Sequence, residues 1–263
     1  MTIARPDDTW LRAQQARADQ PPAGPREPLW LGAEGWLVGS VEPALAERLS
    51  NSGLVVREVG GGGWRVADGD ADIVLSRVAR WLHAHGFVSS WRDELLDVPD
   101  VGGAARARIE RAAVRPLGIA TRAVHLVGHA PGGGCWVQQR ALDKATDPGL
   151  WDTLMGGLIA AGESESQALA RETWEEAGLR VADLQALGPA GRLTVRRPVA
   201  DGYLIEHIAV WSATVPAGLQ PANRDGEVAR FERLEPAALV QGLAQGLFTL
   251  EAGLILAGAA APG

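Results

Sequence analysis

The stretch that most constrains this chain is GGLIAAGESESQALARETWEEAGL, residues 156–179. On a predicted helix, Glu172, Glu175 and Glu176 stand at i, i+3 and i+4, so their carboxylates lie within an arc of roughly 100°. Three clustered like charges repel each other, and a divalent cation with oxygen ligands would turn that repulsion into binding. The arc that can face a core holds five other residues of this helix: Leu169, Ala170, Thr173, Trp174 and Ala177.

The composition is that of a globular protein, with 46% hydrophobic and 22% charged residues among 263. The net charge of -7 argues against nucleic-acid binding and against attachment to an anionic membrane. The single cysteine, Cys135, excludes an internal disulfide, and the first 20 residues lack the apolar core of a signal peptide. We therefore expect a cytoplasmic protein without nucleic-acid or membrane partners, and a homodimer is compatible with the sequence.

Residues 1–114 predict a small α+β domain, and the RPLG segment at 115–118 predicts its boundary. Asp72 is expected to cap a helix through His85, with His83 and His85 at the surface. The other elements expected here are helices at 10–18, 42–49 and 104–113, hairpins of 28–32 with 36–41 and of 54–59 with 64–67, a strand at 91–96 and a loop at 97–103.

Residues 115–263 predict a second domain that mixes strands and helices. The charged helix should run over 164–177, with Gly178 as its left-handed C-terminal cap. The remaining elements expected are strands at 121–127, 136–140, 184–188, 192–197, 206–214 and 228–234, and helices at 236–245 and 249–257.

The spacing of Gly157, Glu163 and the run RETWEEAGL at 171–179 resembles the box of the Nudix hydrolase family. Thr173 stands where the family usually has an aliphatic residue, a departure that affects packing rather than chemistry. The resemblance implies an α/β fold, the Nudix α/β/α sandwich with a mixed sheet, from about residue 121 to the C-terminus. It also implies a magnesium-dependent hydrolase that cleaves a diphosphate, with Mn²⁺ as an alternative ion.

The segments outside the box resemble two narrower groups. Residues 138–140, Lys144, 148–149 and Trp151 resemble isopentenyl diphosphate isomerases, but the cysteine those enzymes use has no counterpart here. The whole chain is more similar to a subgroup with an extra N-terminal domain, related to the Nudix half of fungal thiamine pyrophosphokinase. That resemblance is carried by residues 109–113, 118–125, 144–146 and 225–228. It implies hydrolysis of thiamine diphosphate, or of its oxidised and damaged analogues, to the monophosphate.

The resemblance assigns roles to the box residues. Glu172, Glu175 and Glu176 are the expected metal ligands, and the family adds the backbone carbonyl of Gly157. Glu163 and Arg171 are expected to form an ion pair that braces the loop against the helix. A merely solvated acidic helix face is the alternative for the glutamates, and it leaves the matching glycines and arginine unexplained.

The general base is either a box glutamate, Glu175 or Glu176, or an acidic residue outside the box. Glu227, in an acidic turn, is slightly favoured over Glu206, which opens a strand. Either of these two could instead be an ordinary surface charge.

Substrate contacts are expected from a few side chains outside the box. Arg140, Arg192 and Arg196, together with Arg197, could bind phosphate oxygens, although solvated strand arginines are the alternative. Glu206 is a further candidate. Aromatic stacking on the substrate is open to Trp136, Trp151 and Trp211, for which core packing is the competing interpretation. His125 and His129 are interpreted as structural.

Two other hypotheses compete with the thiamine-type hydrolase. The substrate could be a nucleoside diphosphate derivative, such as a sugar nucleotide or a dinucleotide polyphosphate. Alternatively, the domain could be a noncatalytic ligand-sensing module, although this chain keeps all three box glutamates and its N-terminal half shows no basic helix-turn-helix.

Overall fold

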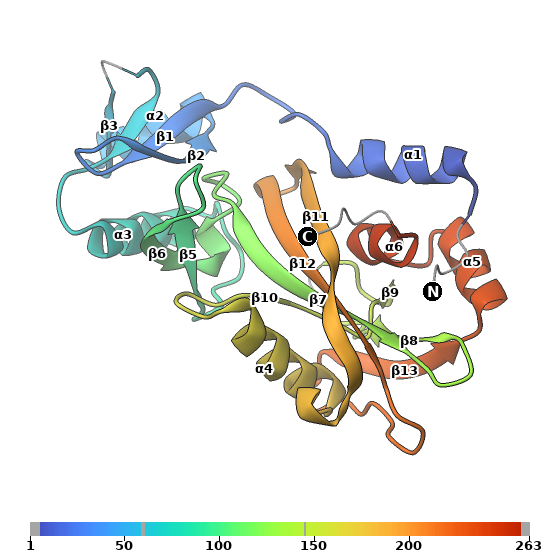
Figure 1. Ribbon diagram of the computed structural model, residues 1–263. Coiled ribbons are helices and arrows are strands. Elements are labelled where there is room, and N and C mark those ends of the chain that lie inside the picture. The colour runs from blue at the N-terminus through green and yellow to red at the C-terminus, as the bar shows by residue number, and fades with distance from the viewer. Residues whose placement is uncertain (1–5, 59–60, 145, 259–263) are drawn as a thin grey trace.

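The computed structural model describes residues 6–58, 61–144 and 146–258. A smaller N-terminal part and a larger part built on a long twisted sheet lie side by side (Figure 1). Gly60, in one predicted turn, and Ala145 lie outside the described residues. None of the helices in the described ranges combines the length and apolar character that a membrane crossing requires.

The N-terminal part is a four-stranded sheet in the order β2-β1-β4-β3, covered by two helices. Both predicted hairpins form, and β1 pairs with β4 in parallel. Its apolar core continues through Ile119 and is separate from the two cores of the larger sheet. The elements are α1 (Asp8–Ala18), β1 (Glu27–Leu31), β2 (Trp36–Val41), α2 (Pro43–Asn51), β3 (Val55–Arg57), β4 (Trp64–Val66), α3 (Ala71–Ala84), β5 (Leu95–Pro99), β6 (Ala105–Glu110) and the 3₁₀ turn η1 (Arg111–Ala113).

Helix α3 begins two residues earlier than the sequence suggested. Asp70 is the cap, because its carboxylate accepts a hydrogen bond from the Ile73 amide at 3.1 Å. The prediction that Asp72 caps the helix was wrong: its carboxylate accepts from the backbone of Arg108 at 2.7 Å and ties α3 to β6.

The segment from 91 to 113 was predicted wrongly. Residues 104–113, predicted as a helix, form strand β6 followed by η1. Strand β6 pairs antiparallel with β5, and most of β5 lies in the segment predicted as a loop. Alanine and arginine favour helix locally, but the alternating side chains of Ala107 and Ile109 are buried when the segment is extended. Burial against α3 therefore overrides the local preference.

The larger part is a seven-stranded mixed sheet with cores on both faces. Five strands follow the order β11-β12-β7-β8-β13, β10 pairs with β7, and β9 pairs with β8. The fold is therefore the expected α/β sandwich preceded by a small sheet-and-helix region. Its elements are β7 (Thr121–His129), β8 (Cys135–Arg140), β9 (Trp151–Asp152), β10 (Met155–Leu158), α4 (Glu165–Ala177), η2 (Val181–Asp183), β11 (Gln185–Val199), β12 (Gly202–Thr214), β13 (Val228–Leu234), α5 (Pro236–Ala244) and α6 (Leu250–Leu256).

Strand β11 is one element where two were predicted. Proline and glycine at 189 and 191 suggested a break, but the pairing with β12 continues past them through register shifts. A bulge absorbs the irregular residues without ending the strand.

Helix α4 carries the three box glutamates, and its sequence fixes both ends. Ser164 and Gln167 form a reciprocal capping box at its start. Gly178 ends it in the left-handed conformation, with φ at 63°, as predicted. Leu169, Thr173 and Ala177 are buried as expected.

Trp174 departs from the predicted core arc of α4. It is 37% exposed, and the guanidinium of Arg224 lies 3.8 Å from the centre of its ring. The indole therefore packs under an arginine at the surface and not in the core.

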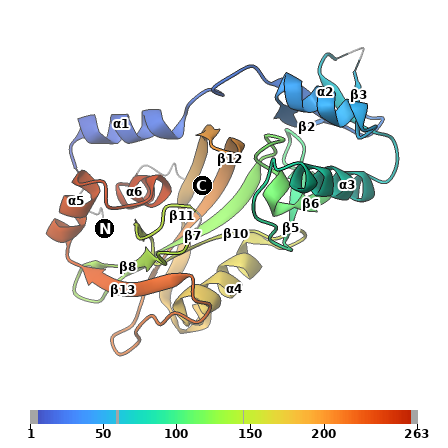
Figure 2. The same cartoon turned by 180° about the vertical axis from the view of Figure 1, so that it is seen from behind.

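Helix α1 lies apart from the N-terminal sheet and packs on the larger part, beside α6 (Figures 1 and 2). Trp10 joins the apolar cluster of α6, and Asp19 forms an ion pair with Arg196 of β11. The hydroxyl of Tyr203 also donates to the Gln20 carbonyl at 2.7 Å. These contacts tie the first 20 residues to the larger part. The predicted boundary between residues 114 and 115 stays a prediction.

Candidate active site

Two glycines of β10 make room for close neighbours, Gly157 for Glu172 of α4 and Gly156 for His125 of β7. A Cβ at Gly157 would lie 2.1 Å from the carboxyl carbon of Glu172, and one at Gly156 would lie 2.5 Å from the ring of His125. Neither position therefore admits a side chain without moving its neighbour. Gly157 accordingly lies against Glu172, one of the three box glutamates.

Glu176 reaches from α4 to strands β8 and β10 of the sheet and is 3% exposed. Its carboxylate accepts a hydrogen bond from the Gln138 side-chain amide at 2.9 Å and one from the Gly156 backbone at 3.1 Å. Burial, followed by the nearby charge of Glu172, raises the pKa of Glu176 to about 8. A carboxylate kept anionic here needs more positive charge than these two donors supply.

Glu172 lies one turn earlier, with 14% of its side chain exposed. Burial raises its pKa to about 7, although the guanidinium of Arg171 opposes the rise and donates to its carboxylate at 2.8 Å. Two neighbouring carboxylates with raised pKa values are typical of a functional site.

Arg171 joins the loop after β10 to α4. It makes two hydrogen bonds to Glu163, at 3.0 and 2.8 Å, and one to the Leu158 carbonyl at 3.2 Å. Glu163 also accepts from the Ala160 amide at 3.1 Å. The bond to Arg171 is the main cause that lowers the pKa of Glu163, and the same bond raises the pKa of Arg171. This geometry matches the expected brace of loop against helix.

Glu175 is the most exposed box glutamate, at 45% of its side chain, and it accepts from Arg171 at 3.1 Å. Within the described ranges, no three His, Cys, Asp or Glu side chains converge as a preformed metal site. The guanidinium of Arg171, which bonds to both Glu172 and Glu175, occupies part of the space between them.

The donor set nevertheless fits a hard divalent cation. All the candidate ligand atoms are oxygens, and Glu172 and Glu176 are buried carboxylates whose ionised forms are disfavoured without added positive charge. A cation here would offset that cost.

The two acidic candidates outside the box differ in environment. Glu227 forms an ion pair with Lys144. Burial acts to raise the pKa of Glu227, but the hydrogen bond and charge of Lys144 outweigh it and the pKa is lowered. Glu206, on β12, accepts from the Thr121 hydroxyl at 3.4 Å, and burial raises its pKa to about 7.

The arginines proposed for phosphate binding lie in different places. Arg140, at the end of β8, donates to the Thr146 carbonyl at 3.0 Å and lies 3.5 Å from Asp152. Arg192 pairs with Glu165 at the start of α4, and Arg196 pairs with Asp19 beyond α1. Of these three arginines, only Arg140 lies on the same strand as a side chain that bonds to a box glutamate: Gln138, also in β8, donates to Glu176.

Residues 120–251 match the family described as the NUDIX domain. The chain belongs to the Nudix family. The matched range includes every predicted site residue, from Arg140 in β8 to Glu227 before β13.

Three known proteins illustrate what the chain is similar to. "Nudix hydrolase 24, chloroplastic" of Arabidopsis thaliana is 32% identical over 173 residues, which is 63% of this chain and 46% of that protein. The isopentenyl-diphosphate Delta-isomerase of Leifsonia xyli is 39% identical over 110 residues, 41% of this chain and 58% of that enzyme. A crystal structure from Deinococcus radiodurans aligns with 65% of this chain and 93% of its own, at 22% identity and a TM-score of 0.48. The chain thus spans less than half the length of the plant relative.

Several residues of the Nudix site were not predicted as site residues. Gln138 bonds to Glu176, and its own Oε1 is buried without a partner among the described residues. Lys144, the only lysine in the chain, holds Glu227. The local sequence signal for Gln138 was its polar side chain, which directly follows the apolar residues that begin β8.

The Nudix-domain cysteine, the histidines and the tryptophans have structural surroundings. Cys135 is buried, and burial raises its pKa to about 12, so it is not poised as an acid or nucleophile. His125 contacts the Thr153 hydroxyl at 3.0 Å and packs over Gly156. Trp136 and Trp211 pack against the apolar core on the α4 face, and Arg230 lies 5.0 Å from the Trp151 ring.

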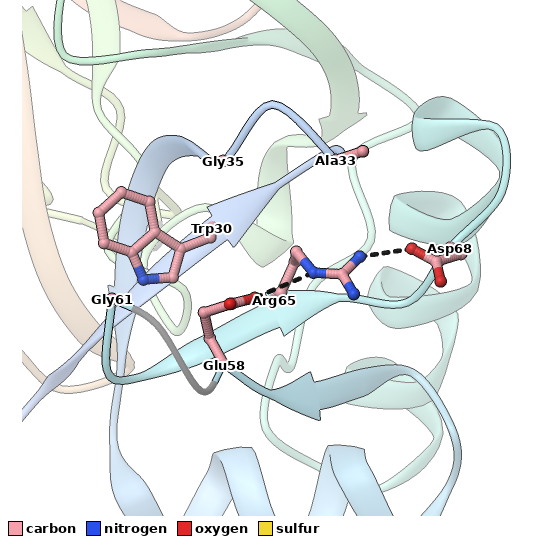
Figure 3. A pocket seen from close by; sticks show the side chains of 7 residues that line it. All are labelled: Trp30, Ala33, Gly35, Glu58, Gly61, Arg65 and Asp68. Atoms are coloured by element: carbon pink, nitrogen blue, oxygen red, sulfur yellow. Dashed lines mark hydrogen bonds and ion pairs between the residues drawn. The ribbon is translucent and has the colours of Figure 1, made fainter.

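A cavity of about 530 Å³ opens on the N-terminal sheet, away from the Nudix box (Figure 3). The indole of Trp30 stands beside Arg65, whose guanidinium is held by Glu58 at 3.0 Å and by Asp68. Because its cation is already paired and none of the predicted site residues lines it, this cavity is separate from the candidate active site.

Proposed function

We propose that this chain is a Nudix-type pyrophosphohydrolase that cleaves a diphosphate linkage with the help of a divalent cation, Mg²⁺ or alternatively Mn²⁺. The observation that carries the proposal is the meeting of Glu172 and Glu176 at the Gly156–Gly157 backbone, where Glu176 is buried, Glu172 is largely buried and both have raised pKa values. Nudix hydrolases generally need such a cation and act on diphosphate compounds, which fits these carboxylates.

The metal would be held by Glu172, Glu175 and Glu176, with the Gly157 carbonyl as a further oxygen ligand. When bound, the cation neutralises phosphate charge and favours attack by water. Arg171 and Glu163 position these carboxylates: their paired hydrogen bonds fix the loop relative to α4. A small displacement of such a constellation is costly for catalysis.

The proton acceptor for the attacking water is proposed among Glu175, Glu176 and Glu227, with Glu206 as the remaining candidate. Glu227 is supported by its ion pair with Lys144, which lowers its pKa and keeps it ionised at neutral pH. Glu206, with a pKa of about 7, is ionised in only about half of the molecules at that pH, although a base of that pKa accepts a proton more readily once it is ionised.

For the substrate we propose thiamine diphosphate or its oxidised and damaged analogues, converted to the monophosphate. The support comes from the four segments that resemble the thiamine pyrophosphokinase-like subgroup. Lys144 of one segment pairs with Glu227 of another, and Thr121 of a third bonds to Glu206. Arg111, of the fourth segment, exerts its charge on both of these glutamates. Segments distant in sequence thus gather beside the box.

The same reasoning extends to the surroundings of the enzyme. We propose a domain boundary near residues 114 and 115. Among the arginines, we propose that Arg140 contacts the substrate; Arg192 and Arg196 are weaker candidates for this contact because each already forms an ion pair. A cytoplasmic location is supported by the single cysteine. The proposed partner is a small diphosphate, without nucleic acid or membrane; a homodimer is compatible with it.

A turnover panel tests the proposal. Purified protein with Mg²⁺ is given thiamine diphosphate, oxidised thiamine diphosphate analogues, sugar nucleotides and dinucleotide polyphosphates, and kcat/KM is compared. We expect the thiamine-type compounds to lead. If nucleotide compounds win by orders of magnitude, the substrate assignment is wrong and the chemistry stands. If the protein binds diphosphates but turns none over, it is a sensing module and the enzyme assignment is wrong.

A further inference from the structure

The N-terminal hairpin β5–β6 is hydrogen-bonded to the loop that carries the Nudix box. The Ala161 amide donates to the Leu95 carbonyl at 2.8 Å, and the Gly162 amide donates to the Asp97 carboxylate at 3.1 Å. The other oxygen of Asp97 accepts from Arg122 of β7 at 2.9 Å. Strand β5 therefore fixes the loop between Gly157 and α4 from outside the Nudix domain (Figure 2).

Two charged side chains stand at the end of this hairpin, next to that attachment. Glu94 directly precedes Leu95, and the Arg111 backbone amide donates to the Glu94 carbonyl at 2.8 Å. The Arg111 guanidinium donates to the Glu94 carboxylate at 2.7 Å through Nη1. The Arg111 side chain remains 42% exposed, so most of its donors can reach a ligand.

The position of Arg111 is also marked by its electrostatic neighbours. Burial is the main influence on the pKa of Glu206 and of Glu227, and the charge of Arg111 is among the further influences that lower each. These glutamates belong to β12 and to the turn before β13, so a single guanidinium lies near both. The charge of Arg111 therefore reaches both acidic candidates outside the box.

The partly exposed pair with Glu94 stabilises the fold little, because water screens ion pairs near the surface. A guanidinium is well suited to phosphate oxygens, and this one is held by a short, hydrogen-bonded turn. A cation whose charge reaches Glu206 and Glu227 would help to attract an anionic substrate toward these carboxylates.

We propose that Arg111 binds a phosphoryl oxygen of the diphosphate substrate, and that Glu94 competes for it in the free protein. This inference rests on the proposed diphosphate hydrolysis and adds a substrate-binding residue from outside the Nudix domain. It gives the N-terminal part a role: β5 holds the loop of the box, and η1 supplies the cation.

The test compares four variants of the full chain: Arg111→Ala, Arg111→Lys, Glu94→Gln and Arg106→Ala. Arg106 is the matched control, since it pairs with Asp100 at the far end of the same hairpin. The readouts are KM and kcat for the preferred substrate with Mg²⁺, the Tm, and calorimetric binding of methylenediphosphonate, which is not hydrolysed.

We expect Arg111→Ala to raise KM and the Kd of the analogue about ten-fold, with Tm within about 2 °C of wild type. The KM and Kd of Arg111→Lys should lie between those of wild type and those of Arg111→Ala. Glu94→Gln should lower KM about two-fold, because it frees the guanidinium, and Arg106→Ala should change nothing. The opposite signs for Arg111 and Glu94 distinguish substrate binding from a structural pair, which would shift Tm in the same direction in both.

Unchanged KM and Kd in Arg111→Ala would overturn the inference, as would a wild type that does not bind the analogue. A wild type that binds the analogue but hydrolyses no diphosphate would overturn the proposed function instead. In that case the Kd values of the variants alone decide the role of Arg111.

Discussion

Gly157 and Glu172 share a space that no side chain at position 157 could enter. A Cβ there would lie 2.1 Å from the carboxyl carbon and 2.3 Å from a carboxylate oxygen of Glu172. The glycine is required because the buried carboxylate approaches the backbone of β10 at that point. This relationship joins the first residue of the box motif to the helix that completes it.

Gly157→Ala should therefore displace Glu172 and inactivate the enzyme. We expect kcat/KM to fall at least about 100-fold and the free energy of unfolding to fall by roughly 1–3 kcal/mol, as in overpacked interiors. Turnover and urea unfolding measure both effects. Gly188→Ala is the control, because a Cβ at Gly188 would meet nothing within 4 Å. Wild-type turnover in Gly157→Ala would show that Glu172 need not keep this position.

Lys144 tests whether Glu227 is the general base. Lys144→Met removes the hydrogen bond and charge that lower the pKa of Glu227, while burial still acts to raise it. If Glu227 accepts the proton, the acidic limb of the kcat/KM profile should move to higher pH, and Lys144→Arg should move it back. An acidic limb that stays in place in Lys144→Met would exclude Glu227 as the base.

Glu206 predicts a pH-dependent stability. Burial raises its pKa from 4.5 to about 7, so the folded state favours the neutral carboxyl. Its contribution to stability is complete below about pH 4.5 and is lost as the pH rises through about 7.

Glu206→Gln mimics the neutral form, so it should exceed wild type in free energy of unfolding by roughly 1–3 kcal/mol at pH 8. At pH 4 the two proteins should be equally stable. Chemical denaturation across this range checks the difference, with exposed Glu232→Gln as control. A constant offset between wild type and Glu206→Gln at all pH values would contradict this account.

Local sequence signals predicted the elements that carry the site. The i, i+3, i+4 spacing of the glutamates and the left-handed Gly178 are properties of one short segment, so the sequence alone was enough to place α4. The ion pair of Arg171 with Glu163 also spans only eight residues.

Tertiary contacts decided what the sequence could not predict. Residues 104–113 have helix-favouring side chains, yet pairing with β5 and burial against α3 make them a strand and a turn. That error hid Arg111, whose place beside Glu206 and Glu227 depends on three distant segments meeting. Asp70 and Asp72 were both plausible caps of α3 by residue type. The structure distinguishes them, because Asp70 accepts from the Ile73 amide while Asp72 accepts from the Arg108 amide of β6.

The central claim is that the carboxylates of α4 perform diphosphate hydrolysis, and Glu176→Gln tests it most directly. The amide keeps the shape of the buried side chain and removes its charge, so Tm should stay within a few degrees of wild type. With Mg²⁺ and the preferred diphosphate, the account predicts a fall in kcat/KM of at least about 10³-fold. Turnover equal to wild type in a folded Glu176→Gln protein would contradict it.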